Sequence, residues 1–340
     1  MSEVMKMAID DGSTNVKVSW IENKVLKTII SPNSFRKDWK SAALRKDKKI
    51  YNYEIGNTKY TYDATSDKEY QYDDLNLLSV HHALLQTGVT PCDVAITVTL
   101  PITEFYNPDD CQRNEEKIEK KRRNLMRPIT LNKGELFNIV SVEVMPESLP
   151  AALSRLIGSG CNEFTKTLVI DCGGTTLDMG IIVGEFDDVS DVYGNNEIGV
   201  SMVTDATRKA LAAADSDSSY LVANEFIKRR HDMSFVRDVV NDESQIPKIL
   251  EKMQNKIDEL GTQVAHEAKK FAKNPNRVYL VGGGASLIYD AIKAAYPTLG
   301  DRVELLDDAQ SALAREICLY TTEEDEVYRE APVKAEVDDE

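Results

Sequence analysis

Two stretches of this chain place a carboxylate, a glycine and hydroxyl side chains in the same order. The first reads IDDGSTNVK from Ile9, and the second reads IDCGGTTLD from Ile170. Glycine lets the backbone approach a ligand closely, and turn N–H groups and hydroxyls donate hydrogen bonds to phosphate oxygens. An aspartate beside phosphate needs a divalent cation between them, and Mg²⁺ is usually held by a carboxylate, phosphates and water. The pattern therefore indicates two half-sites for a polyphosphate with Mg²⁺.

One such stretch alone is also typical of a tight turn without a ligand, but two matching copies favour the functional interpretation. Alignment of the copies pairs Asp10 with Asp171, which indicates these two carboxylates as the Mg²⁺ ligands. Asp11 is adjacent and able to share that role, so the sequence does not separate it from Asp10. Lys17 can reach a phosphate as a point charge, whereas its counterpart is Asp178, so the copies are related but not equivalent.

A third glycine turn, Gly282-Gly283-Gly284, follows the apolar run RVYLV and precedes a helical pattern. A strand, bare backbone and a helix N-terminus in succession form a setting in which nucleotides bind. The spacing of this turn is neither that of a dinucleotide fold nor that of a Walker loop.

Each turn needs strands to hold it, and the hydrophobic periodicity predicts them. Alternating or continuous apolar residues predict strands, and apolar residues three or four positions apart predict helices. The predicted strands are residues 4–9, 16–21, 25–30, 93–101, 136–144, 167–171, 177–184 and 277–281. Helices are predicted at residues 75–88, 113–127, 201–214 and 247–274, and also from Pro146 and after Gly284. The tyrosine-rich residues 31–72 predict a small antiparallel sheet.

The order of elements restarts after the middle of the chain, which predicts an α/β protein of two related domains. Domain I is expected at residues 1–165, with an inserted subdomain at about 31–90, and domain II at residues 166–305. Residues 306–320 are expected to form a C-terminal helix that returns to domain I. Residues 321–340 are expected to be a disordered acidic tail.

Composition is that of an ordinary soluble globular protein, with 42% hydrophobic and 29% charged residues. No apolar run is long enough to cross a bilayer, and the N-terminus does not read as a targeting signal. The five cysteines form no C-x-x-C pair. These features predict a cytoplasmic protein without membrane contact. The net charge of −16, of which the last twenty residues carry −7, argues against direct nonspecific binding to duplex DNA.

Three further features are interpreted as structural. His81-His82 lies in an apolar helix and is expected to pack rather than to bind metal. The basic run KIEKKRR at 117–123 is interleaved with acids, which favours a solvated helix or a subunit contact over a nucleic-acid site. Cys172 lies inside the second turn, where packing is the expectation and reactivity the alternative.

Taken in order, several segments resemble the plasmid-segregation actins of the ParM (StbA) type, within the superfamily of actin, Hsp70 and sugar kinases. They are IDDGSTNVK, ISPNSFR, VHHALL, TLPITEFY, MPESLPA, IDCGGTTLD, GVSMVT and VGGGASLI, and they span roughly residues 7–295. The resemblance implies an actin-like ATPase fold, in which two RNase H-like α/β domains flank a nucleotide cleft. Nothing carries over to the tail after about residue 320.

Position by position, the resemblance implies a role for each turn. Asp10 and Asp171 orient Mg²⁺ through water, and Glu147 in MPES positions the water that attacks the γ-phosphate, so that Glu147 and Asp171 are the catalytic residues. The alternative for Glu147 is an acid favoured by a helix dipole. Glu225 and Lys228 are further candidates beside the adenine or ribose. The expected nucleotide-binding residues are Asp10, Asp11, Gly12, Ser13, Thr14, Asn15, Lys17, Gly173, Gly174, Thr175, Thr176, Gly282, Gly283 and Gly284.

The function implied by the resemblance is ATP-driven assembly with Mg²⁺. Subunits that hold ATP form filaments, slow hydrolysis to ADP destabilises them, and GTP is a possible substitute for ATP. The filaments segregate plasmid copies through a DNA-bound adaptor protein, so contact with DNA is indirect. Two alternatives share the scaffold, a sugar or acetate kinase and a chaperone-like ATPase. Against the kinase, no acidic base in a substrate loop is evident in the sequence.

Overall fold

The computed structural model describes residues 4–12, 14–33, 35–39, 50–62, 71–322 and 328–329. Within these residues the chain forms two compact units. The first contains the described residues up to Phe105, together with Arg113–Ser154 and the described residues from Ser311 onward. The second contains Tyr106–Gln112 and Arg155–Gln310. Ser13 and most of the acidic tail lie outside the described residues, so the expectations for them stay predictions.

The first unit is built on a six-stranded sheet. Its strand order is β15-β3-β2-β1-β7-β9, in which β1, β2 and β3 are antiparallel neighbours and β1, β7 and β9 run parallel. Most side chains of β1 and β7 are buried, as expected for strands at the centre of a covered sheet. The bounds are β1 Met5–Asp11, β2 Asn15–Glu22, β3 Val25–Pro32, β7 Asp93–Leu100, β9 Asn138–Pro146 and β15 Tyr328–Arg329.

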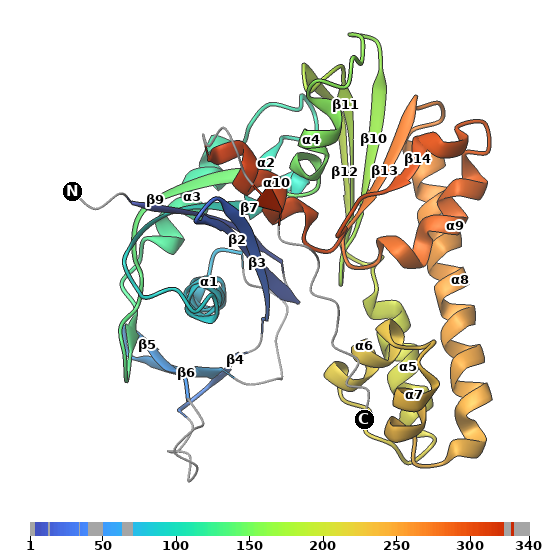
Figure 1. Cartoon of the computed structure of the whole chain (residues 1–340), viewed down its shortest axis with the longest axis horizontal. Helices are drawn as coiled ribbons and strands as arrows, with labels where there is room; N and C mark the ends of the chain where they lie inside the picture. The colour runs from blue at the N-terminus through green and yellow to red at the C-terminus, as the bar shows by residue number, and fades with distance from the viewer. Residues whose placement is uncertain are drawn as a thin grey trace. The chain divides into compact units, whose positions relative to one another are not determined.

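A second, four-stranded sheet in this unit has the order β4-β6-β5-β8. Helix α1 (Asp74–Gln86) lies between the two sheets (Figure 1). Its Leu77, Leu78 and Leu84 are fully buried. Helix α10 (Ala312–Thr321) packs against β1 and β2. The remaining bounds in this unit are β4 Phe35–Lys37, β5 Asn52–Ile55, β6 Thr58–Tyr62, β8 Thr130–Leu131, α2 Ile102–Phe105, α3 Glu115–Leu125, and the 3-10 helix η1 Leu149–Ala152. Along the chain, α4 Leu153–Leu156 spans the boundary between the first unit and the second.

The second unit has a five-stranded sheet of order β12-β11-β10-β13-β14. Its antiparallel strands β12, β11 and β10 are followed by the parallel strands β13 and β14, which repeats the order β3-β2-β1-β7-β9 of the first unit. The bounds are β10 Lys166–Cys172, β11 Leu177–Val183, β12 Asp188–Asn195, β13 Arg277–Val281 and β14 Val303–Leu305. The internal sequence repeat is therefore a structural repeat.

Helices cover the sheet of the second unit. Helix α9 packs against β13 and β14, and the long helix α8 packs against α9 and α5 (Figure 1). Helix α8 buries Ile249, Met253, Ile257, Leu260 and Val264, which lie three or four positions apart and form one apolar stripe. The bounds are α5 Ser201–Ala212, α6 Tyr220–Lys228, α7 Met233–Val239, η2 Glu243–Gln245, α8 Ile246–Phe271, α9 Ala285–Ala295 and η3 Gly300–Arg302.

Most predicted elements are present, but the helix predicted from Pro146 is wrong at its start. Pro146 is the last residue of β9, where it lies opposite Leu100, and the helical segment begins with η1 at Leu149. Here Pro150, not Pro146, takes the first-turn position that tolerates a missing N–H. The sequence analysis also missed β12 and α7, which have no clear apolar alternation.

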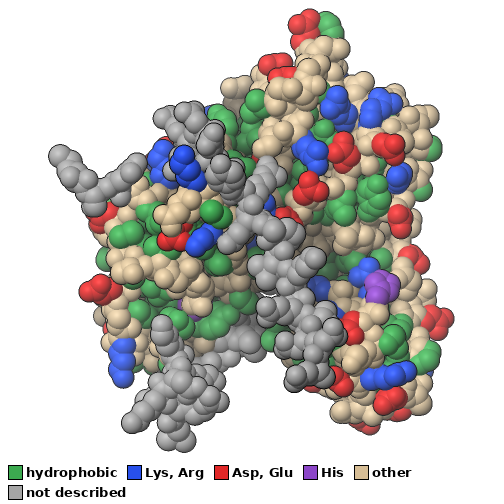
Figure 2. All heavy atoms as spheres, viewed as in Figure 1, with side chains coloured by type: hydrophobic (Ala, Val, Ile, Leu, Met, Phe, Trp, Pro, Cys, Tyr) green, Lys and Arg blue, Asp and Glu red, His purple; other side chains and the backbone are tan. Residues whose placement is uncertain are grey.

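The surface agrees with the mixed charge pattern of the sequence. Acidic and basic side chains are interspersed over the visible described surface of both units (Figure 2). Among the helices of the described ranges, none is both long and apolar enough to span a membrane.

Candidate functional site

The first glycine turn joins β1 to β2 at the carboxyl end of β1. Asp10 lies opposite Lys17 in the strand ladder, and the carboxylate and the ammonium are 2.8 Å apart. Their side chains are 10% and 15% exposed, so the pair lies largely inside the protein while still reaching its surface. This turn therefore places the positively charged Lys17 ammonium beside a carboxylate that can act as an oxygen ligand.

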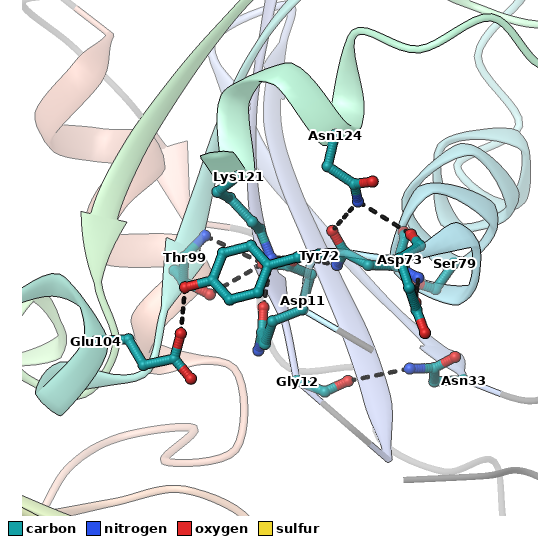
Figure 3. A network of polar contacts seen from close by, with 12 residues as sticks. Asp11, Gly12, Asn33, Tyr72, Asp73, Ser79, Thr99, Glu104, Lys121 and Asn124 are labelled. Carbon is teal, nitrogen blue, oxygen red and sulfur yellow. Dashed lines mark hydrogen bonds and ion pairs between the residues drawn. The ribbon is translucent and has the colours of Figure 1, made fainter. Parts of the chain in front are cut away.

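The backbone of this turn is held by Asn33, which follows β3. The N–H of Asn33 donates to the carbonyl of Thr14 at 3.0 Å, and its Nδ2 donates to the carbonyl of Gly12 at 3.5 Å (Figure 3). Asn15 Nδ2 donates to Thr14 Oγ1 at 3.5 Å. The predicted residues Gly12, Thr14 and Asn15 thus share one braced turn.

Asp11 has surroundings quite different from those of Asp10. Its carboxylate is fully buried and accepts hydrogen bonds from Asn76 Nδ2 at 2.6 Å and from the N–H and the Oγ1 of Thr99, each at 3.1 Å (Figure 3). Lys121 Nζ lies 2.5 Å from it, and both side chains are 0% exposed. Because these groups surround the carboxylate, the geometry favours a bracing role for Asp11, and its role as a nucleotide ligand stays a prediction.

Sequence reasoning missed Lys121, which it assigned to a solvated basic run. Residues Ile118, Lys121 and Leu125 lie three and four positions apart and form the buried face of α3. Lys121 also donates to Gln71, and the neighbouring Asn124 donates to the carbonyl of Asp73 at 3.0 Å (Figure 3). Lys121 takes a position where the helical spacing calls for an apolar residue, and a lysine buried in this way needs a carboxylate partner such as Asp11. This spacing was the signal in the sequence that could have predicted the ion pair.

The second glycine turn joins β10 to β11 and differs from the first in charge. Asp171 lies opposite Asp178, where the first turn pairs aspartate with lysine. Burial and, after it, the neighbouring Asp171 charge raise the pKa of Asp178 to about 7, while a hydrogen bond from Thr176 acts in the opposite direction. The buried Asp178 carboxylate and the partly exposed Asp171 carboxylate therefore lie side by side near the end of β10.

The backbone of the second turn is fixed by the start of α5. The N–H of Gly173 donates to the carbonyl of Thr176 at 2.8 Å and closes the turn. The N–H groups of Val200 and Ser201 donate to the carbonyls of Gly173 and Gly174, at 3.1 and 2.7 Å. The GVSMVT segment thus supports the backbone of the turn.

The third glycine turn lies beside the second. Strand β13 runs parallel to β10, and Val281 lies opposite Asp171, so Gly282 follows at the same sheet edge. Gly282 has φ +87°, and a Cβ there would lie 2.1 Å from Asp171 Oδ1 and 2.6 Å from the Cys172 carbonyl oxygen. Only glycine fits this position. The N–H of Gly284 donates to the same Cys172 carbonyl at 2.8 Å.

Glu147 directly follows β9. Its N–H donates to the carbonyl of Leu100 at 2.7 Å, and its side chain is partly exposed. Because β1, β7 and β9 are parallel neighbours, their carboxyl ends meet at one edge of the sheet. The Asp10 turn and Glu147 therefore lie on the same edge, separated by β7, and ligands of α/β sheets bind at such edges.

The predicted residues thus fall into two sets. In the first unit, Asp10, Gly12, Thr14, Asn15, Lys17 and Glu147 share one sheet edge. In the second unit, Asp171, Gly173, Gly174, Thr175, Thr176, Gly282, Gly283 and Gly284 share the corresponding edge. Glu225 and Lys228 form an ion pair of 3.0 Å on α6, and their proposed place beside the base stays a prediction.

The carboxylate and hydroxyl oxygens of the turns fit Mg²⁺ better than a metal ion that is coordinated by protein side chains alone. In the described ranges, no group of three or more His, Cys, Asp or Glu side chains is arranged to hold a metal ion. Mg²⁺ is usually bound through one or two carboxylates with phosphates and water, and not by an all-protein cage. The adjacent Asp171 and Asp178 carboxylates, with the raised pKa of Asp178, mark a position where a cation would relieve repulsion.

The remaining candidates from the sequence, His81, His82 and Cys172, lie in surroundings that favour a packing role. His81 and His82 are buried, and Tyr53 Oη lies 2.8 Å from His82 Nδ1. Cys172 is fully buried, and burial, with the Asp171 charge, raises the pKa of its thiol to about 12. The thiol therefore stays protonated, which removes the reactive alternative for this cysteine.

Two family patterns match the chain one after the other. The family described as plasmid segregation protein ParM, N-terminal, matches residues 5–157. The family described as plasmid segregation protein ParM, C-terminal, matches residues 161–320. No curated protein matches the sequence.

Solved structures share the fold at low sequence identity. A pCBH ParM non-polymerisable quadruple mutant has a TM-score of 0.68 at 16% identity, covering 94% of this chain and 99% of its own. A 15-stranded ParM filament from Clostridium botulinum gives 0.66 at 15% identity, with 94% and 99% covered. The archaeal actin homolog Ta0583 in complex with ADP gives 0.62 at 17% identity, with 94% and 100% covered. The two repeated sheets therefore form an actin-like fold.

Proposed function

The chain belongs to the ParM family of plasmid segregation proteins, which are actin-like filament proteins, and from this premise we propose that it is an ATPase whose assembly is controlled by Mg-ATP. The observation that carries the proposal is the repetition of one site plan. In each unit a carboxylate ends the central strand and a glycine turn follows at the carboxyl edge of the sheet. A polyphosphate needs such groups on two sides, and each of the two units has one such set.

The first turn is proposed to bind the phosphates. Lys17 supplies a positive charge, and the N–H groups and side chains of Gly12, Ser13, Thr14 and Asn15 donate to phosphate oxygens. In the second unit, the N–H groups and hydroxyls of Gly173, Gly174, Thr175 and Thr176 do the same. The turn at Gly282, Gly283 and Gly284 passes beneath the adenosine.

Asp10 and Asp171 are proposed to hold Mg²⁺ through its water shell. When bound, Mg²⁺ neutralises phosphate charge and stabilises the charge that develops during phosphoryl transfer. Lys17 keeps the Asp10 carboxylate oriented at 2.8 Å, so that this oxygen ligand is already directed when a cation arrives.

Hydrolysis is proposed to depend on Glu147. Its carboxylate accepts a hydrogen bond from a water and holds it in line with the γ-phosphorus. Attack forms a bond from the water oxygen to phosphorus and breaks the bond to the oxygen that bridges the β- and γ-phosphates. The products are ADP, phosphate and a proton. With one positioning carboxylate and water as the phosphoryl acceptor, the reaction is proposed to be slow and suited to a timer of filament lifetime.

At the level of the cell we propose a cytoplasmic filament that moves plasmid copies. A DNA-bound adaptor links the filament end to the plasmid, because the net charge of −16 disfavours direct contact of this chain with DNA.

The proposal is tested by mixing the purified chain with Mg-ATP, Mg-GTP or Mg-ADP and following light scattering, sedimentation and phosphate release. We expect polymer with ATP, followed by phosphate release and disassembly. A Glu147→Ala variant is expected to assemble at a similar concentration but to hydrolyse about 100-fold more slowly, so its polymer persists.

Two results would contradict the proposal. One is the lack of sedimentable polymer at every concentration together with phosphorylation of a sugar or of acetate, which would identify a kinase. The other is a Glu147→Ala polymer that disassembles at the wild-type rate, which would remove Glu147 from the hydrolysis step.

A further inference from the structure

The backbone reverses sharply directly after Glu147. Ser148 has φ 71° and ψ −64°, and the carbonyl of Glu147 accepts a hydrogen bond from the N–H of Leu149 at 2.9 Å. This is a γ-turn with a positive central φ, the rare and strained form of that turn. A residue with a Cβ pays a steric penalty in this conformation, and glycine does not.

Ser148 differs from the other non-glycine residues of positive φ. In the described ranges these are Asn23, Lys24, Asp38, Cys111, Ser148, Phe186, Asp215 and Asp308. All but Ser148 are exposed or partly exposed, whereas Ser148 is 0% exposed. Surface turns adopt such conformations readily, so the buried example is the one that requires a reason.

The structure around the turn holds the strain in place on both sides. Pro146 lies opposite Leu100 at the end of the sheet, and the N–H of Glu147 donates to the Leu100 carbonyl at 2.7 Å. After the turn, Leu149 is 1% exposed and the N–H of Ala151 donates to the Ser148 carbonyl at 3.2 Å. From Pro146 to Ala152, Glu147 alone keeps a partly exposed side chain. The fold therefore fixes every neighbour and leaves one carboxylate at the surface.

We propose that Ser148 is a positioning residue for hydrolysis, because its γ-turn sets the direction in which Glu147 leaves the sheet edge. Strained backbone conformations persist where the surrounding structure over-determines them, and they cluster at functional sites. Hydrolysis is sensitive to displacements of about 1 Å in the position of the attacking water. An accurately directed Glu147 therefore gives the strained turn a role that starting a short helix alone would not explain. This inference rests on the role proposed above for Glu147.

Two substitutions separate the turn from the hydroxyl of Ser148. Ser148→Gly removes the hydroxyl and keeps the turn, because glycine adopts positive φ freely. Ser148→Thr keeps the hydroxyl and disfavours the turn, because positive φ is a true outlier for a β-branched residue. With saturating Mg-ATP, we expect Ser148→Gly to release phosphate within about twofold of wild type and Ser148→Thr to be about 10- to 100-fold slower. Affinity for a fluorescent ADP analogue is expected to change less than about threefold in both.

Three controls make the comparison specific. Asp215→Thr places threonine at another positive φ, 51°, in an exposed loop, and is expected to leave phosphate release unchanged. Ser148→Ala is the companion of Ser148→Gly, since both lack the hydroxyl. If Ser148→Thr does not fold, phosphate release within about twofold of wild type by both Ser148→Ala and Ser148→Gly supports a role of the turn without the hydroxyl, and slow release by both overturns the inference. Thermal unfolding of each variant establishes that the folded protein is being measured.

A double variant tests whether Ser148 acts through Glu147. If it does, Ser148→Thr slows the wild-type protein but adds nothing to Glu147→Ala, since residues that act as a unit are not additive. An additional slowing of tenfold in the Glu147→Ala background would overturn the inference. Provided that Glu147→Ala remains slow, a normal rate of phosphate release by Ser148→Thr would also overturn the inference, whether Ser148→Gly is slow or not. Normal hydrolysis by Glu147→Ala would instead overturn the proposed role of Glu147.

Discussion

At the scale of single residues, two adjacent aspartates do different things. Asp10 pairs with Lys17 in a largely buried position that still reaches the surface, and Asp11 pairs with Lys121 in the fully buried interior. The internal alignment pointed to Asp10, and the alternation of a strand explains why the next carboxylate points to the other face. The partner of Asp11 lies 110 positions away and belongs to a charged helix, where only the apolar register of Lys121 marks it as buried.

Removing the Lys121 charge is expected to destabilise the fold strongly. Lys121→Met leaves the Asp11 carboxylate buried without its cation, which costs about 3–5 kcal/mol of unfolding free energy. Adding Asp11→Asn removes the second charge and is expected to recover a large part of that loss. Urea unfolding of both variants measures the two values.

Lys120→Met is the matched control on the same helix. Lys120 is exposed, although its ammonium lies 4.3 Å from the Tyr72 ring centroid, so a loss of at most about 1 kcal/mol is expected. A Lys121→Met variant as stable as this control would contradict a buried ion pair.

At the scale of elements, the sequence predicted the strands and helices that have strong periodicity and failed where context decides. The helix α8 and the strand β10 were found because their apolar residues are regular. Pro146 was misassigned because proline is allowed both at a helix start and at a strand end, and only pairing with β7 settles it. The γ-turn at Ser148 leaves no local sequence signal, since serine has no preference for positive φ.

Two buried histidines of α1, His81 and His82, predict that the stability of the fold depends on pH. Burial lowers the pKa of His81 and of His82 to about 4, so the folded protein keeps both rings neutral. The unfolded chain binds these protons near pH 6.5, and stability is therefore complete above that pH and falls as the pH drops towards 4. We expect a loss of about 1–2 kcal/mol for each histidine between pH 6.8 and 5.2, measured by urea unfolding.

His82→Phe provides the control for this prediction. The ring of His82 stacks on Tyr62 with centroids 4.1 Å apart, so phenylalanine keeps an aromatic ring there, although the contact with Tyr53 Oη is lost. The variant is expected to lose about half of the pH effect. An unchanged pH profile would assign the effect to other groups.

The support of the second turn by α5 gives a prediction for nucleotide binding. A Cβ on Gly199 would lie 2.8 Å from the Thr175 carbonyl carbon and 2.9 Å from the Gly174 carbonyl oxygen, both backbone atoms. Gly199→Ala must therefore displace the turn, and we expect at least about a tenfold loss of ADP affinity.

Fluorescence titration with a labelled ADP compares Gly199→Ala with wild type, and thermal unfolding establishes that the variant is folded. Equal affinity of Gly199→Ala and wild type would contradict the supporting role of α5.

At the scale of the whole molecule, the repeat in the sequence predicted the repeat in the fold. The two stretches that begin at Ile9 and Ile170 mark the same strand in two sheets that share the order of five strands. The inserted small sheet was also expected, but its fourth strand, β8, lies at residues 130–131 and joins from a distant part of the chain. Such long-range pairing depends on tertiary packing and not on local pattern.

The net charge of the molecule predicts how assembly responds to salt. Subunits that each carry −16 repel one another, and salt screens that repulsion. Replacing Glu330, Glu336, Asp338, Asp339 and Glu340 by their amides removes five of these charges. We expect a lower critical concentration for polymer in low salt and no difference at about 1 M salt, measured by sedimentation. Identical critical concentrations in low salt would show that the tail charge does not oppose assembly.

The repeated hairpins differ at one corresponding position, where Lys17 faces Asp10 in one sheet and Asp178 faces Asp171 in the other. The scaffold is thus doubled while its charge is not, since one hairpin carries a balanced pair and the other an excess of negative charge. Under the proposed function, the Lys17 hairpin attracts phosphate directly, whereas the Asp171–Asp178 hairpin accepts it only together with a cation.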